Sequence, residues 1–553
     1  MTTTFCGPSL EGQAGIGALT LGGFLTEVVE RFGPNEALVF DDPLRGGETV
    51  RWTYEDLGRE AHRVALGLLE NGDGEGAATG ILMGNRPEAV AALFGVALAG
   101  GVAVLLSTFA PKPELAHMVE RAGIRTVLTQ DRLLKRSFTS DLDDLRDGTS
   151  GPTYVVSVGT DSWDSFLSGR VLHASAVERV ASSVTPDDDG VVIFSSGTTS
   201  APKGMVHAHR AATLQFWVQS QIFGRHEQTR MWSSLPMFWT AGLNTAMGST
   251  LAAGGCWVVQ ETFEPGEALR LMARERVTEP YTLPHQTGAL EEHPDWAATD
   301  LSSLTCVYGK SAFARHPKVH GDTTWRMPVG YGLSETCAFF CAHWWSASRD
   351  EMARSMGRLL PGNELRVVDS DTGRALGAGD TGELAIKGPT LMKRYLGVAV
   401  EDTFDADGFF RTGDAGSVDG DGFVHWEGRR TEMIKTGGAN VSPAELEVQL
   451  RACAPVKLAR VVGIPDPRLD QLVVACITLK EGAEATEANI QGFLRERVAS
   501  YKVPKRVLFF DDGEIPMTTS DTKVRDDALV ALVEQRLATD PRQPSVHSTA
   551  GDR

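Results

Sequence analysis

A loop rich in glycine and hydroxyl residues carries the clearest chemical signal. It follows an apolar run, Val191–Phe194, and reads FSSGTTSAPKG from Phe194 to Gly204. Such a loop can point several backbone N–H groups at one anion, and its hydroxyls add further donors. The spacing differs from the GxxxxGK[ST] pattern of a Walker A loop. The sequence therefore predicts a phosphate loop of another kind, with six contact residues: Ser195, Ser196, Gly197, Thr198, Thr199 and the cationic Lys203.

Four further motifs follow along the chain. Gly330–Thr336 reads GYGLSET, Arg411–Asp414 reads RTGD, Glu427–Arg430 reads EGRR, and Ile434–Glu447 reads IKTGGANVSPAELE. Together with the phosphate loop they resemble the motifs of the adenylate-forming superfamily, which includes acyl-CoA synthetases, the adenylation domains of peptide synthetases and luciferases. The resemblance covers about residues 25–535, and the last motif resembles the CoA-ligase branch.

The resemblance implies how a nucleoside is bound. Tyr331 would stack on adenine, and Gly309 would flank the base. Asp414 would accept hydrogen bonds from both ribose hydroxyls, as a carboxylate does well, and Arg429 would be a second nucleotide contact. These expectations make ATP a substrate.

The resemblance also assigns the groups around the α-phosphate. Ser334 would contact it, and Glu335 together with Thr198 would hold Mg²⁺, a hard cation that prefers oxygen ligands. Lys523, in the run IPMTTSDTKVR, matches the lysine that neutralises charge while the acid attacks. The implied first step is attack of a carboxylate on the α-phosphate, which gives an acyl-adenylate and pyrophosphate.

The CoA side is implied by the IKTGGANVSPAELE motif. In the family this loop swings to line the pantetheine tunnel, after the small domain has rotated about a hinge. Lys435, Gly437 and Gly438 would line that tunnel, and Thr431 stands at the hinge position. The CoA thiolate then attacks the acyl carbonyl and expels AMP. The sequence thus predicts an ATP-dependent, AMP-forming carboxylic acid–CoA ligase.

The acid itself is predicted only as a class. Trp239, Lys310 and Gly332 are the expected acid contacts. Further aromatic residues are expected to build an apolar pocket for the acid. The predicted substrate is therefore a hydrophobic carboxylic acid and not acetate. These further residues are Phe339, Phe340, Trp344 and Trp345.

Some residues depart from the family pattern. Asp521 and Thr522 stand before Lys523 where a single glycine is usual, and Lys310 is bulky and charged beside the expected adenine site. Thr431 replaces a common Asp or Lys, and Trp239 replaces a frequent His. The first two departures affect adenylation, because a misplacement of about 1 Å can lower a rate on the order of 100-fold.

These departures leave alternatives open. One is a ligase that performs mainly the thioesterification step, on an acyl-adenylate supplied by a partner ligase. A second is a non-catalytic protein that binds an acyl-adenylate or a nucleotide. A luciferase-like oxygenase and an adenylation protein for a carrier domain are further readings.

The elements that position these motifs alternate between strand and helix. Ala77–Met83, Val102–Leu106 and Arg125–Thr129 are predicted strands, with helices over Pro87–Ala99 and Glu114–Ala122 between them. Strand–helix–strand order predicts a parallel sheet and an α/β fold. We expect a large multi-subdomain α/β domain over residues 1–430, with a β-rich part at about 360–427. A small, mobile α+β lid should span 431–553, with a disordered tail after about residue 537.

Composition narrows the class of partner. The 553 residues include 53 Lys and Arg against 72 Asp and Glu, a formal charge of −19, so nucleic-acid binding is disfavoured. The seven cysteines are scattered and include no CxxC pair, so a structural zinc site is not expected. Their number and spacing favour a reducing, cytoplasmic compartment. The uncharged stretch Ala89–Leu106 is interrupted by Gly100-Gly101 and is interpreted as buried helix and strand, not as a membrane span. A homodimer is a family expectation.

Overall fold

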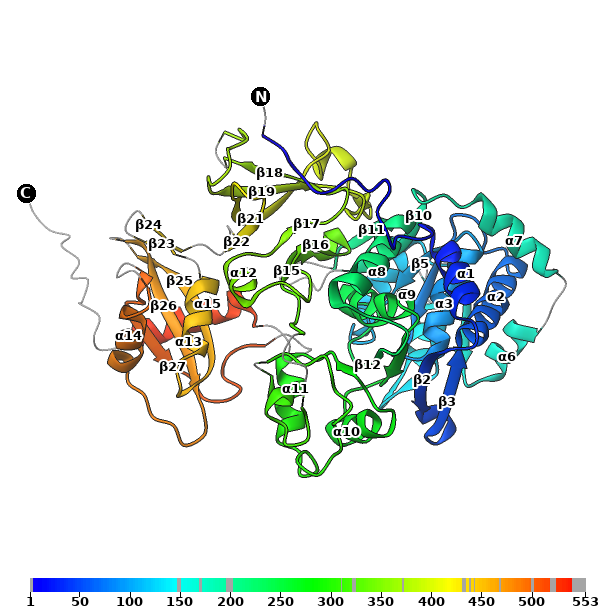
Figure 1. Cartoon of the computed structure of the whole chain (residues 1–553), viewed down its shortest axis with the longest axis horizontal. Helices are drawn as coiled ribbons and strands as arrows, with labels where there is room; N and C mark the ends of the chain where they lie inside the picture. The colour runs from blue at the N-terminus through cyan, green and yellow to red at the C-terminus, as the bar shows by residue number, and fades with distance from the viewer. Residues whose placement is uncertain are drawn as a thin grey trace, which may run out of the picture.

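The structure is a computed structural model. It describes residues 3–146, 151–168, 172–194, 202–309, 311–320, 325–369, 372–429, 434–436, 439–441, 443–466, 469–498, 502–517 and 524–539. The architecture is α/β, with a large N-terminal domain and a smaller C-terminal one, as predicted (Figure 1).

A seven-stranded sheet forms the centre of the N-terminal domain. Its strand order is β20-β11-β10-β5-β4-β6-β9, and all neighbours from β10 to β9 are parallel. The predicted strand–helix–strand order is therefore confirmed. Its strands are β4 (Ala78–Leu82), β5 (Val102–Leu105), β6 (Thr126–Gln130), β9 (Tyr154–Val158), β10 (Asp189–Phe194), β11 (Gly204–Ala208) and β20 (Arg394–Tyr395).

A second, five-stranded sheet lies beside the first. Its order is β14-β12-β13-β2-β3, and only β3 runs antiparallel to its neighbour. Its strands are β2 (Glu36–Asp42), β3 (Glu48–Thr53), β12 (Arg230–Ser233), β13 (Cys256–Val259) and β14 (Glu279–Pro280). Both sheets thus present the carboxyl ends of parallel strands, the edge at which open α/β sheets bind ligands.

Helices cover these two sheets because their apolar faces bury against strands and against each other. The helix α3 is buried along its whole length, and a Cβ on Gly95 would lie 2.6 Å from Val64 of α2, so the two helices approach closely. The helices are α1 (Leu21–Phe32), α2 (Tyr54–Glu70), α3 (Pro87–Leu98), α4 (Lys112–Ala122), α5 (Phe138–Arg146), α6 (Asp161–Ser168), α7 (Ala174–Ser183), α8 (His209–Phe223), α9 (Ser249–Ala252), α10 (Pro265–Arg274) and α11 (Pro284–Glu291).

The apolar stretch Ala89–Leu106 is the buried helix α3 followed by the buried strand β5, as predicted. Within the described part of the chain, no helix combines the length and apolarity that crossing a membrane requires.

The β-rich part of the domain consists of antiparallel strands. One sheet has the order β1-β18-β19-β21-β22, and a smaller one has the order β15-β16-β17. The strands are β1 (Phe5–Cys6), β15 (Gly330–Leu333), β16 (Ala338–Ala342), β17 (Arg358–Leu359), β18 (Glu364–Val368), β19 (Gly382–Lys387), β21 (Phe410–Val418) and β22 (Val424–Arg429). A short helix, α12 (Arg349–Arg354), and a hairpin of β7 (Arg132–Leu133) and β8 (Arg136–Ser137) complete the domain.

The C-terminal region has a sheet and core of its own. The order is β24-β23-β26-β25, with β27 parallel to β26, and the cores packed on this sheet contain only residues from Ile434 onward. Helix α15 continues to Thr539, and the residues after it lie outside the described part of the chain. The elements are β23 (Ile434–Thr436), β24 (Ala439–Val441), α13 (Pro443–Arg451), β25 (Val456–Asp466), β26 (Asp470–Leu479), α14 (Glu487–Arg495), β27 (Arg506–Phe509) and α15 (Asp526–Thr539).

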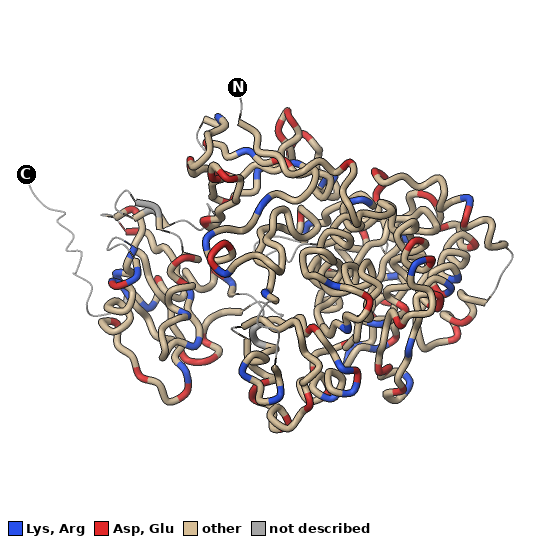
Figure 2. The backbone as a smooth tube through the Cα atoms, viewed as in Figure 1, with Lys and Arg blue, Asp and Glu red and all other residues tan. Residues whose placement is uncertain are grey.

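Charged residues of both signs are interspersed along the chain (Figure 2). Among the described residues, no single acidic tract is seen on either domain in this view.

A buried histidine makes stability depend on pH. Nδ1 of His209 accepts a hydrogen bond from the backbone N–H of Leu21 at 3.3 Å, which requires the unprotonated ring. Burial lowers the pKa of His209 to about 4, although Asp188 and Asp189 oppose the shift. Between pH 6.5, the ordinary pKa of histidine, and a pH of about 4, the His209 ring is protonated in the unfolded chain but not in the folded protein. Stability should therefore fall with decreasing pH in this window, by about 1.4 kcal/mol per pH unit for this group.

Thermal unfolding midpoints from pH 7.5 to 5 check this prediction. His209→Gln should flatten the fall below pH 6.5, whereas the exposed His173→Gln should leave it unchanged. Identical profiles for His209→Gln and wild type would contradict it.

Candidate active site

The predicted phosphate loop begins at the carboxyl end of a central strand. β10 ends at Phe194, and its antiparallel neighbour β11 starts at Gly204. Residues 195–201 lie outside the described residues, and with them Ser195, Ser196, Gly197, Thr198 and Thr199. Lys203 is described and its side chain is exposed. The strand pair therefore places the two ends that flank this loop, Phe194 and Gly204, at the ligand-binding edge of the sheet.

Pairing of β11 with β20 brings Lys203 together with Glu335. Met205 is opposite Tyr395 in this pair, and Lys203 Nζ lies 5.5 Å from the centroid of the Tyr395 ring. The Tyr395 hydroxyl donates to Glu335 Oε1 at 2.7 Å. Tyr395 thus connects the predicted phosphate-binding lysine to the predicted metal ligand. The sequence analysis missed Tyr395, because no motif marks it and the pairing of β20 is long-range.

Tyr331 and Asp414, both expected to contact the nucleoside, form a hydrogen bond with each other. Tyr331 and Asp414 are 6 % and 1 % exposed, and the Tyr331 hydroxyl donates to Asp414 Oδ2 at 2.6 Å. Burial and the adjacent carboxylate of Asp414 raise the pKa of Tyr331 far above its ordinary value, so the phenol stays protonated as a donor. Arg429 is the backbone partner of Asp414 in the β21–β22 pair. Two of the expected nucleoside contacts are therefore bonded to each other, and the backbone of the third lies beside them.

The turn between β15 and β16 presents Ser334 and Glu335. A single helical turn spans Ser334–Thr336, and both side chains are half-buried beside the exposed Gly332. The turn ends at Cys337, which has a φ of +60° and whose carbonyl accepts a hydrogen bond from the side-chain amide of Asn244. The buried Asn244 therefore anchors the end of the turn.

Gly332 is required sterically in this strand pair. A Cβ at this position would lie 1.8 Å from the carbonyl oxygen of Ala338, because a bulge follows Tyr331. Gly332→Ala should therefore displace the Ser334 turn, and a shift of about 1 Å is expected to lower the rate of adenylation roughly 100-fold. Gly420→Ala is the control, since a Cβ there has no neighbour within 4 Å.

Pyrophosphate-exchange rates of the two glycine variants check this prediction. If Gly332→Ala retained wild-type exchange, the close approach to Ala338 would not matter for the site.

The aromatic residues expected to form one acid pocket do not all face it. Phe339 and Phe340 are neighbours on β16, so their side chains point to opposite faces. Phe340 is buried in the core of the β-rich part, and Trp344 is 44 % exposed. Phe339 and Trp345 pack instead around Phe223 of α8. The expected set of four aromatic pocket residues is therefore wrong in Phe340.

Trp239 follows the carboxyl end of β12, as Phe109 follows that of β5. Their ring centroids are 5.9 Å apart, and each ring also contacts Phe238. Gly309 lines a cavity of about 720 Å³, together with Tyr308, Val329 and Arg349 among others. Lys310 lies outside the described residues.

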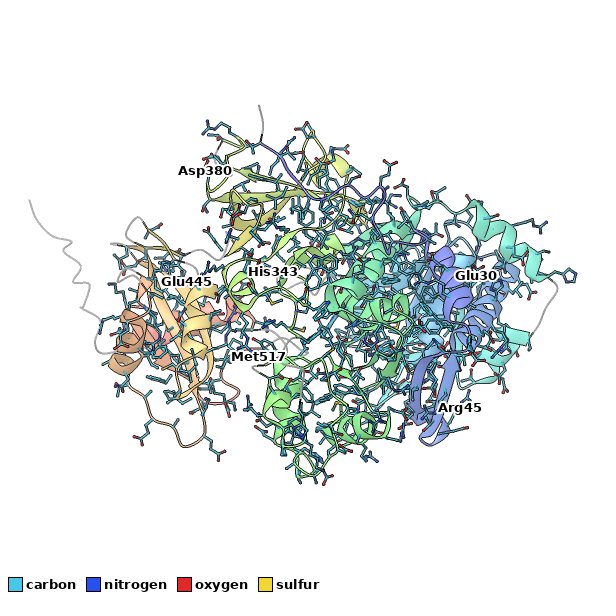
Figure 3. The ribbon with its side chains drawn as sticks, viewed as in Figure 1. Glu30, Arg45, His343, Asp380, Glu445 and Met517 are labelled. Carbon is cyan, nitrogen blue, oxygen red and sulfur yellow. The ribbon has the colours of Figure 1, made fainter. Side chains whose placement is uncertain are left out.

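The remaining predicted residues belong to the C-terminal region. Thr431, Gly437, Gly438 and Lys523 lie outside the described residues, and only the backbone of Lys435, paired with Asn440, is described. Met517 pairs with Val524, the residue after Lys523. In Figure 3 Met517 lies on the side of the C-terminal domain that is turned toward the rest of the chain.

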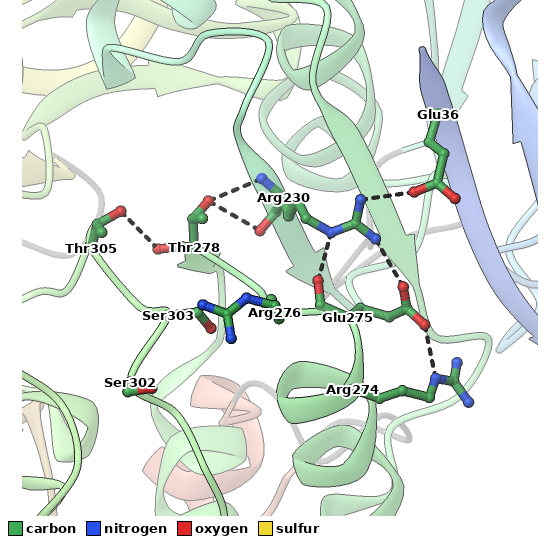
Figure 4. Close-up of a pocket in the computed structure, with 9 residues that line it drawn as sticks. All are labelled: Glu36, Arg230, Arg274, Glu275, Arg276, Thr278, Ser302, Ser303 and Thr305. Carbon is green, nitrogen blue, oxygen red and sulfur yellow. Dashed lines mark hydrogen bonds and ion pairs between the residues drawn. The ribbon is translucent and has the colours of Figure 1, made fainter. Parts of the chain in front are cut away.

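A second pocket, of about 670 Å³, lies at the opposite edge of the five-stranded sheet (Figure 4). Arg230 and Glu36 stand at the amino ends of β12 and β2, and they pair at 2.8 Å. Glu275 bonds to Arg230 and Arg274, each at 2.8 Å. Four of its charged residues are thus paired with each other, and the pocket lies away from the carboxyl ends of the strands, at which the nucleotide residues lie.

Comparisons with known proteins agree with this geometry. Residues 25–396 match the family model described as AMP-binding enzyme, and residues 445–522 match that described as AMP-binding enzyme C-terminal domain. Indoleacetate–CoA ligase of Aromatoleum aromaticum is 29 % identical over 88 % of this chain and 94 % of its own length. 4-Coumarate–CoA ligase 3 of Oryza sativa subsp. japonica is 30 % identical over 87 % of each chain. The structure of ATP-bound MatB from Rhodopseudomonas palustris shares the fold, with a TM-score of 0.77 at 24 % identity over 93 % of this chain and 99 % of that one.

Proposed function

The chain belongs to the AMP-binding enzyme family and is an ATP-dependent, AMP-forming acid–CoA ligase, and we propose that its substrate is an aromatic carboxylic acid. The named relatives act on indoleacetate and 4-coumarate, both of which carry an aromatic ring. The observation that carries the proposal is the surface of Phe109, Phe238 and Trp239, placed at the same sheet edge as the nucleotide residues. Such a surface suits a flat apolar group.

In the first half-reaction the acid carboxylate attacks the α-phosphorus of ATP, and pyrophosphate leaves. Asp414 binds the ribose hydroxyls, and Tyr331 holds that carboxylate in place by its own hydrogen bond. Ser334 donates from the β15–β16 turn to the α-phosphate, while Lys203 offsets the charge of the phosphates. Lys523 supplies a further positive charge, which offsets the negative charge that develops on the α-phosphate in the transition state.

In the second half-reaction the CoA thiolate attacks the acyl carbonyl carbon. A C–S bond forms, the bond to the adenylate oxygen breaks, and AMP leaves. Lys435 and the adjacent Gly437-Gly438 line the path of the thiol in this proposal. Thr431, between β22 and β23, is the proposed hinge for the change between the two steps.

Glu335 fits a magnesium ion held mostly by ATP. No cluster of three His, Cys, Asp or Glu side chains suited to a metal occurs in the described ranges, so a site built from protein ligands alone is not found there. Mg²⁺ commonly binds through one or two carboxylates plus phosphates and water. Glu335, half-buried and fixed by Tyr395, would provide such a carboxylate, and the ion would neutralise phosphate charge.

Pyrophosphate exchange with a panel of acids tests the proposal. Acid-dependent exchange should be faster with 4-coumarate and indole-3-acetate than with acetate, and CoA should then release AMP. Exchange that is faster with acetate would contradict the aromatic assignment. If exchange is absent but a supplied acyl-adenylate reacts with CoA, the thioesterification-only alternative replaces the proposal.

A further inference from the structure

The buried residue Asn85 lies where the two parallel sheets meet. It lies between β4 of the seven-stranded sheet and α3, next to the N-cap residue Arg86, and is 2 % exposed. Its side chain reaches to the loop after β12, in the other sheet. Asn85 therefore stands at the carboxyl edge of both sheets, where the candidate active site lies.

The amide of Asn85 makes two hydrogen bonds to that loop. Nδ2 donates to the carbonyl of Leu235 at 2.8 Å, and Oδ1 accepts from the backbone N–H of Met237 at 3.0 Å. These partners are 150 and 152 residues away in the chain. A carboxamide carries a donor and an acceptor on one planar group, so a single side chain bonds to both backbone groups of the loop.

The segment around Asn85 is held in place by the ion pairs of the next residue. Its neighbour Arg86 is fully buried and bonds to Glu88 at 2.9 Å and to Asp42, at the end of β2, at 3.2 Å. Arg86 also reaches Glu261, two residues beyond β13, at 3.3 Å. The ends of β4, β2 and β13 are thus connected, so the position of Asn85 is determined by three strands.

The loop that Asn85 holds carries two of the three rings of the aromatic surface, Phe238 and Trp239. Phe238 and Trp239 directly follow Met237, and Phe109 packs edge-on against both, with centroids 5.4 and 5.9 Å away. Phe109 is 50 % exposed, so the surface is open to a ligand. The chain then enters a π-helix, Ala241–Gly248, whose Asn244 bonds to the carbonyl of Cys337. The aromatic surface is therefore connected to the Ser334 turn.

We propose that Asn85 is a positioning residue for acid binding: it holds the aromatic surface of Phe109, Phe238 and Trp239 against the acyl group. The inference rests on the proposed function. Without the amide, the carbonyl of Leu235 and the N–H of Met237 lose their partner, and buried polar groups are then expected to move toward water. The loop shifts, and the rings no longer meet the acid while ATP binding persists.

Steady-state pyrophosphate exchange with 4-coumarate tests Asn85→Ala and Asn85→Asp. Asn85→Ala should raise KM for the acid about tenfold or more, whereas KM for ATP should stay within about twofold. Asn85→Asp keeps the acceptor for Met237 and loses the donor to Leu235, so its acid KM should lie between those of wild type and Asn85→Ala.

Asn363→Ala is the matched control. Asn363 is 1 % exposed and its Nδ2 donates to the carbonyl of Phe340 at 2.8 Å, so it is an equally buried side-chain amide with one backbone partner, in the β-rich part of the domain. It should lower thermal stability without changing the ratio of the two KM values. An unchanged acid KM in Asn85→Ala, or equal changes in both KM values, would overturn the inference. A wild-type protein without acid-dependent exchange would instead contradict the proposed function.

Discussion

Replacing Lys523 with alanine should abolish most of the adenylation rate and leave thioesterification nearly intact. The lysine is expected to stabilise charge that develops on the α-phosphate only while pyrophosphate leaves. Loss of one such contact removes about 3–4 kcal/mol of transition-state stabilisation, a rate decrease of roughly 100- to 1,000-fold. Pyrophosphate exchange should show this decrease, whereas thioester formation from a supplied acyl-adenylate and CoA should change by less than about threefold.

Lys457→Ala is the control for this comparison. Lys457 belongs to the same domain and pairs at the surface with Asp512 at 2.8 Å, and such pairs contribute little to stability. It should leave both half-reactions unchanged. Equal losses in the two half-reactions of Lys523→Ala would show that the lysine acts in another way. Unchanged exchange would mean that the residues Asp521 and Thr522 before it place the lysine away from the phosphate.

Replacing Asp414 with asparagine should weaken ATP binding strongly. The variant loses the negative charge that accepts hydrogen bonds from the ribose and from Tyr331, whose hydroxyl lies 2.6 Å from Oδ2. Hydrogen bonds to a buried charged group are worth about 1.5–3 kcal/mol, so KM for ATP should rise roughly 10- to 150-fold. Initial rates of exchange at varied ATP concentrations measure this effect.

The contrast with Lys523 makes the Asp414 prediction specific. The ribose is present in ATP and in the acyl-adenylate, so Asp414→Asn should also impair the reaction of a supplied acyl-adenylate with CoA. Tyr331→Phe keeps the ring and removes only the donor to Asp414, and its KM for ATP should rise less than that of Asp414→Asn. An Asp414→Asn variant with a normal KM for ATP would refute the ribose assignment.

The motif residues could be named from sequence because their chemistry is local. A glycine- and hydroxyl-rich loop, a carboxylate after a Tyr-Gly turn and a lysine near the C-terminus are visible without knowing which strands pair. The strand and helix pattern was equally accessible, since the alternation around Pro87–Leu98 and Val102–Leu105 follows from continuous apolar runs bounded by glycine and proline. The fold class follows from that alternation.

What the sequence could not show is which distant residues meet. Tyr395 reaches Glu335 only because β20 pairs with β11, and Asn85 reaches Leu235 only because two sheets share an edge. The error at Phe340 has the same origin: two adjacent aromatic residues look like one pocket in sequence, but a strand sends them to opposite faces. The sequence predicts which groups do the chemistry, because their types and spacing are local, and the long-range pairing of strands decides which of the described residues meet.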